Sequence, residues 1–159
     1  MDEHAKAAEY RWLALQGAVL MSDVWTADNR TRWKRTVASM KKAGDTDGMR
    51  RLYQWRMETS ARQRGVDHPN TLITENNLAW FLLRQGLAED ASPLFERLEK
   101  AWETHDESWR PIWANVGWTL CKGVQGTSYE EAEASIKQLE KILGADSAKV
   151  QSARKILAK

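Results

Sequence analysis

The chain has 159 residues and a formal net charge of +2, with 42% hydrophobic and 29% charged residues. A mean hydropathy of −0.64 and the lack of an apolar run of about 20 residues argue against a membrane span, so we expect no membrane partner. The single cysteine cannot form an internal disulfide, and the first residues lack the pattern of a secretory signal, so we expect a cytoplasmic location.

Helical periodicity runs along the chain from its beginning. Good helix formers dominate, and no alternating pattern of β-branched residues predicts a strand. The first helix shows the spacing plainly, because apolar residues recur three and four positions apart at Ala5, Ala8, Trp12, Leu15 and Val19. We predict eight helices, over residues 4–21, 29–43, 46–64, 69–85, 88–102, 109–122, 129–143 and 147–158.

Breaks between the helices carry recognisable signals. Gly44 ends the second helix, and Asp45 caps the third. Pro69 suits the first turn of the fourth helix, where a missing N–H costs nothing. Ser128 and Glu131 have the spacing of a capping box at the seventh helix. Connections this short imply antiparallel neighbours, and the length suits a single helical domain spanning residues 1–159.

Part of this pattern repeats. The segments Asn77–Leu82 and Asn115–Leu120 align, and each precedes a glycine, a turn and an amphipathic helix. Ala79 and Gly117 occupy matching positions inside the two segments. Small residues there would let each helix approach its partner closely, as would Ala91 and Ala132 in the helices that follow.

This arrangement resembles the tetratricopeptide repeat. More narrowly, His68–Leu72 followed by Asn76–Ala79 resembles the kinesin light chain type of repeat, although Asn70 stands where that group has Asp. The match is strongest over residues 65–103, whereas residues 108–143 lack the His-Pro element and residues 30–64 match loosely. The resemblance implies an all-α fold in which antiparallel helix-turn-helix repeats form a short right-handed solenoid with capping helices at both ends. It also implies a structural role for His68.

The same resemblance implies a binding groove. In that family the first helix of each pair lines a concave face, where asparagines bind the backbone of an extended peptide. The matching positions here are Asn76, Asn77, Trp80, Arg84, Asn115, Trp118 and Lys122, with Arg32 and Arg35 from the weaker copy. Basic side chains there would favour an acidic peptide. The alternative is that the tryptophans belong to the core and the asparagines bridge adjacent helices.

Two further functions remain open. Residues 30–64 hold eleven Lys and Arg against three acidic residues, an excess of +8. This segment could bind nucleic acid, with phosphate contacts and a base stacked on Trp33 or Trp55. The phosphate contacts would come from Arg30, Arg32, Lys34, Arg35, Arg50, Arg51, Arg56, Arg62 and Arg64. Alternatively, the first helix could pair with another copy in a homo-oligomer.

Catalytic motifs are missing from the sequence. It holds no nucleophile elbow, phosphate loop, zinc-ligand spacing or dinucleotide fingerprint. Cys121 has no histidine near it in sequence and is expected to be a small packed residue. We therefore predict a non-enzymatic protein-interaction scaffold without cofactor or metal, and we rank an acidic peptide partner ahead of nucleic acid.

Overall fold

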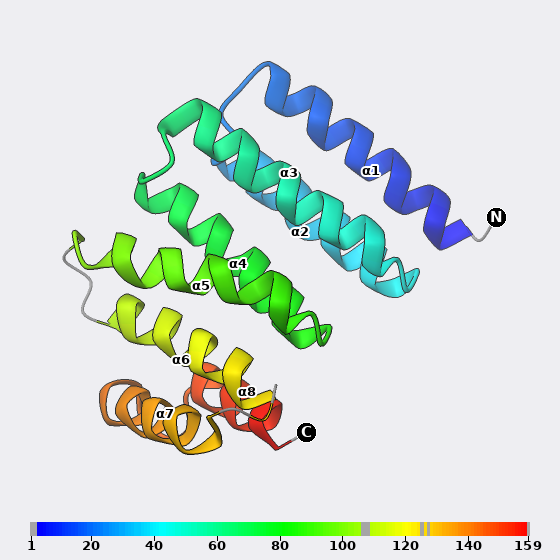
Figure 1. Ribbon diagram of the computed structural model, residues 1–159. Helices are drawn as coiled ribbons and strands as arrows, with labels where there is room; N and C mark the ends of the chain where they lie inside the picture. The colour runs from blue at the N-terminus through cyan, green and yellow to red at the C-terminus, as the bar shows by residue number, and fades with distance from the viewer. Residues whose placement is uncertain (1–2, 106–108, 125, 127, 159) are drawn as a thin grey trace. The chain divides into compact units, whose positions relative to one another are not determined.

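A computed structural model describes residues 3–105, 109–124, 126 and 128–158. Within these residues the chain forms eight α-helices and no strand, which confirms the predicted all-α class (Figure 1). The helices are α1 (Glu3–Leu20), α2 (Ala27–Lys42), α3 (Thr46–Arg64), α4 (Pro69–Arg84), α5 (Ala88–Trp102), α6 (Trp109–Val124), α7 (Tyr129–Leu143) and α8 (Ala148–Leu157). No helix of the described chain is both long enough and apolar enough to cross a membrane.

The chain divides into two compact units, Met1–Thr74 and Glu75–Lys159, here called unit 1 and unit 2. Helix α4 contains the boundary between them. In unit 1, α1 packs on α2 and α2 packs on α3. In unit 2, α5 packs on α6, α6 packs on α7, and α8 contacts both α6 and α7. Consecutive helices such as α1 and α2, or α5 and α6, run antiparallel (Figure 1), as the short connections imply.

Helix ends follow local chemistry, and most lie within two residues of their predicted positions. The Asp45 side chain accepts a hydrogen bond from the Gly48 N–H at 2.7 Å, so it caps α3 as predicted. Gly44 adopts a positive φ of 66° in the turn before it, a conformation that glycine reaches without steric cost. Thr26 caps α2 by accepting from the Asn29 N–H at 3.2 Å, which explains why α2 begins two residues early.

The predicted capping box at α7 is wrong. Ser128 occupies the N-cap position, but its side chain makes no capping hydrogen bond. The carboxylate of Glu131 lies instead 3.9 Å from the Lys122 ammonium of α6. Glu130 and Glu131 still place negative charge in the first turn of α7, where the helix dipole favours it.

A buried arginine organises the core of unit 1. Arg56 of α3 is only 6% exposed, and its guanidinium lies 4.6 Å and 4.4 Å from the ring centroids of Trp25 and Trp33. Burial lowers the pKa of Arg56 to about 10, which still leaves it charged at neutral pH. Trp25 precedes α2 and Trp33 lies within it, so this cation joins α3 to both segments through cation–π contacts.

Helix α1 has two apolar faces. One face is buried in unit 1 through Ala8, Leu15 and Val19. The other face is exposed at Tyr10, Leu13 and Leu20, and Met21 just beyond the helix is exposed as well. Self-assembly through α1 would use this second face, and it stays a prediction.

Close helix crossing shapes unit 2. Gly117 of α6 lies directly against the Phe95 ring of α5, so closely that a Cβ atom there would overlap the ring. Ala79, Ala91 and Ala132 are fully buried. Between α6 and α7, the hydroxyls of Thr119 and Ser135 share a buried hydrogen bond of 2.7 Å. The predicted close approach at Gly117 is therefore confirmed.

Replacing Gly117 by alanine should destabilise the protein. The added methyl group has no space beside Phe95, and overpacking of this kind costs about 1–3 kcal/mol. Gly17→Ala is the matched control, because open space surrounds this exposed position of α1 and alanine there should stabilise the helix by roughly 0.5–1 kcal/mol. Urea unfolding followed by circular dichroism measures both changes. Equal stabilities for the two variants would contradict the close crossing.

Candidate functional site

The four groove residues predicted on α4 differ in solvent exposure, and one of them is buried. Asn77 and Arg84 are exposed and Asn76 is half-buried, whereas Trp80 is only 3% exposed. The Trp80 ring stacks on Trp113 of α6, with ring centroids 3.9 Å apart and planes 12° apart. It also meets the edge of Phe95 at 5.2 Å. The structure therefore assigns Trp80 to the core of unit 2, the alternative that the sequence left open for this residue.

The predicted residues of α6 already have partners inside unit 2. Asn115 is half-buried and donates from Nδ2 to Glu99 Oε1 of α5 at 2.8 Å. The Lys122 ammonium lies 3.4 Å from the centroid of the Trp118 ring and 3.9 Å from Glu131. The Asn115 and Glu131 contacts join α6 to α5 and α7, and the Lys122–Trp118 contact lies within α6. These side chains are therefore less available to a ligand than the sequence suggests.

The two arginines of the weaker copy lie on α2 of unit 1. Arg32 and Arg35 are both exposed. Arg35 lines a hollow of about 370 Å³ between α1 and α2, together with Arg11 and Lys42. These residues are cationic surface groups of unit 1, and they are described separately from the residues of unit 2.

Arg84 belongs to the clearest candidate site of unit 2. It lines a hollow of about 580 Å³, here called the α4–α8 hollow, together with one face of α8. The α8 residues that line it are Ala148, Gln151, Ser152, Lys155 and Ile156. Two cationic groups, an amide and a hydroxyl thus surround one space, and none of these lining residues is acidic. Such a set can bind carboxylates and the polar groups of a peptide backbone.

Sequence reasoning missed the contribution of α8, which it treated only as a capping helix. The helix buries Val150, Ala153 and Ile156. Gln151 and Lys155 are four positions apart on another side of the helix, one turn from each other. This polar spacing was visible in the sequence, but nothing there indicated that Arg84 would lie across the hollow from it.

The His68 imidazole and the Cys121 thiol, two other reactive side chains, do not lie in the α4–α8 hollow. His68 Nδ1 accepts a hydrogen bond from the Asn70 N–H at 3.1 Å, which places the imidazole at the entrance of α4. Cys121 is fully buried, and burial raises the pKa of its thiol to about 12. Among the residues that the structure describes, no group of three His, Cys, Asp or Glu side chains is arranged to hold a metal ion.

Comparison with known proteins adds no assignment to this geometry. No protein-family model matches the chain, and no curated protein sequence matches it. The resemblance to tetratricopeptide and kinesin light chain repeats therefore stays a prediction from the sequence. The candidate site depends on the α4–α8 hollow itself.

The Cys121 thiol should be inert in the folded protein. A pKa of about 12, against about 8.5 for an unfolded thiol, lowers the thiolate fraction at pH 8 on the order of a thousandfold. Iodoacetamide should therefore label the guanidinium-unfolded chain quickly and the native chain at least that much more slowly, as mass spectrometry can measure. Rapid labelling of the native protein at pH 8 would show that α6 does not bury this side chain.

Proposed function

We propose that the protein is a non-enzymatic interaction module that binds an extended acidic peptide segment in the α4–α8 hollow of unit 2. The observation that carries the proposal is the convergence of Arg84 and Lys155 on a hollow of about 580 Å³ whose lining residues include no carboxylate. Two cations that line one hollow attract anionic groups to it.

Each lining group has a suitable role. The Arg84 guanidinium can bind a carboxylate through two parallel hydrogen bonds, and Lys155 adds a point charge. Gln151 Nε2 donates to the Ala145 carbonyl at 2.8 Å, which fixes the orientation of this amide beside the hollow. The neighbouring Arg154 pairs with Glu140 of α7, so its charge is directed elsewhere.

The spacing along α8 favours an extended chain. Successive turns of a helix are about 5.4 Å apart, and two residues of an extended peptide span about 6.6 Å. Gln151 and Lys155, one turn apart, can therefore contact alternate residues of such a peptide. The resemblance to tetratricopeptide repeats separately supports peptide binding here, because it implies that Arg84 is one of the residues that line a peptide-binding groove.

Removing both cations from the hollow should weaken peptide binding. The probe is a fluorescein-labelled decapeptide of alternating Glu and Ser, with binding followed by fluorescence anisotropy. The charge interactions of these partly solvated groups contribute roughly 0.7 kcal/mol each, so Arg84→Ala combined with Lys155→Ala should raise Kd about tenfold.

The matched control removes the same charge elsewhere in unit 2. Lys100→Ala combined with Lys141→Ala changes two exposed lysines that do not line the hollow. This pair should raise Kd less than threefold at 150 mM salt, where long-range charge effects are screened. If the two double variants lose affinity equally while their circular dichroism is unchanged, the hollow is not the site.

A further inference from the structure

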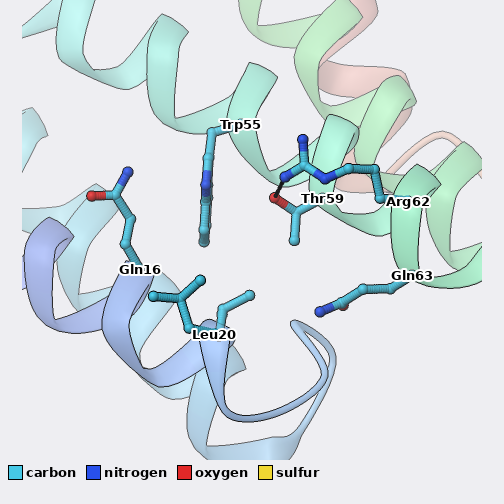
Figure 2. Close-up of a pocket in the computed structure, with 7 residues that line it drawn as sticks. Gln16, Leu20, Trp55, Thr59, Arg62 and Gln63 are labelled. Carbon is cyan, nitrogen blue, oxygen red and sulfur yellow. Dashed lines mark hydrogen bonds between the residues drawn. The ribbon is translucent and has the colours of Figure 1, made fainter.

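A second pocket lies in unit 1, between α1 and α3. Its volume is about 420 Å³, within the range of small-ligand pockets. Helix α1 supplies Gln16, Val19 and Leu20, and α3 supplies Trp55, Thr59, Arg62 and Gln63. Figure 2 shows the Trp55 ring projecting from α3 toward Leu20, with one ring face turned toward Thr59 and Arg62. We call this space the Trp55 pocket.

Hydrogen bonds position the polar side of the Trp55 pocket. Arg62 donates from Nη2 to Thr59 Oγ1 at 3.1 Å and is itself exposed (Figure 2). Gln63 Oε1 accepts from the Val24 N–H at 3.0 Å, which joins α3 to the turn after α1. A guanidinium and an amide therefore lie at defined places in the same pocket as the Trp55 ring.

Trp55 differs from the other three tryptophans of unit 1. Arg56 covers both Trp25 and Trp33, and Arg51 lies 5.8 Å from the centroid of Trp12. Trp33 is only 9% exposed, so it cannot take the stacking role that the sequence allowed it. Trp55 is half-buried, and its ring lines an open pocket.

Exposed positive charge is dense on unit 1, and one of its cations, Arg62, lines the Trp55 pocket. Of the eleven Lys and Arg in residues 30–64, ten are exposed and only Arg56 is buried. The exposed cations are Arg30, Arg32, Lys34, Arg35, Lys41, Lys42, Arg50, Arg51, Arg62 and Arg64. This density of cations suits a polyanion better than a single carboxylate.

We propose that unit 1 binds single-stranded nucleic acid, with one base stacked on Trp55 inside the pocket and a flanking phosphate held by Arg62, while the other exposed cations of unit 1 add long-range attraction. Stacking on an aromatic ring accepts any base, so the site selects single strands rather than a sequence. An acidic peptide would use the same cations but has no need of the flat Trp55 face. This proposal is independent of the peptide site in unit 2.

The first experiment separates base stacking from charge. Fluorescein-labelled decaadenylate is titrated into the full chain at 50 mM salt, beside an abasic ribose-phosphate decamer of equal charge. Decaadenylate should bind at least tenfold more tightly. Trp55→Leu should weaken its binding about tenfold by removing the ring, and Trp55→Phe should restore most of the loss. Arg62→Gln should lower the slope of log K against log salt by about one.

The second experiment substitutes two highly exposed residues, so we expect the variants to fold normally. Leu20 and Met21 are 86% and 89% exposed, but only Leu20 lines the Trp55 pocket. Leu20→Glu and Met21→Glu add the same charge at neighbouring positions. Leu20→Glu should weaken decaadenylate binding at least fivefold more than Met21→Glu, because the new carboxylate stands where the base and its phosphates would bind.

Three results would overturn the proposal. The first is equal binding of decaadenylate and the abasic decamer. The second is equal loss for the Leu20 and Met21 variants, which would show that charge alone matters and would decide the question even if Trp55→Leu fails to fold. The third is a decaglutamate peptide that binds more tightly than decaadenylate and is equally sensitive to Trp55→Leu, which would identify a peptide site.

Discussion

The packing of tryptophan rings determines which surfaces of this protein remain for a ligand. In unit 1 the Arg56 guanidinium lies between Trp25 and Trp33, and it loses hydration that the two ring faces partly replace. In unit 2, Trp80 stacks on Trp113 and meets Phe95, which itself fits against Gly117. These contacts bury the rings of Trp33, Trp80 and Trp113, whereas Trp55 lines an open pocket of unit 1. In unit 2, Arg84 and α8 line the α4–α8 hollow.

The helices and their ends were predictable because their causes are local. Periodicity within a few turns placed all eight helices, and Asp45 caps α3 through a neighbour only three residues away. The close approach at Gly117 was also predictable, because Gly117 and Ala79 occupy matching positions in the two aligned segments and small residues allow close helix crossing. Ser128 shows the limit of such rules: the spacing to Glu131 fits a capping box, but Glu131 lies near Lys122 of another helix.

The candidate sites depend on contacts that local patterns do not encode. From the sequence alone, Trp80 of α4 could lie either in a groove or in the core. It lies in the core because its ring stacks on Trp113, which is distant in the sequence. Lys155 joins the candidate site only because α8 lies across the hollow from Arg84.

Net charge also distinguishes the two proposed sites. Unit 1 carries a net charge of +4 and unit 2 a net charge of −2. The polyanion proposal for unit 1 rests on this excess of positive charge, whereas the peptide proposal for unit 2 rests on the local convergence of Arg84 and Lys155.

The central claim is that an acidic peptide binds at the α4–α8 hollow despite the stronger positive charge of unit 1. Two-dimensional ¹H–¹⁵N correlation spectra, recorded while the Glu-Ser decapeptide is added at 150 mM salt, test this claim residue by residue. Our account predicts that the largest amide shifts occur at Arg84 and along α8 from Gln151 to Ile156. Shifts concentrated in α2 and α3, with the amides of α8 unchanged, would contradict it.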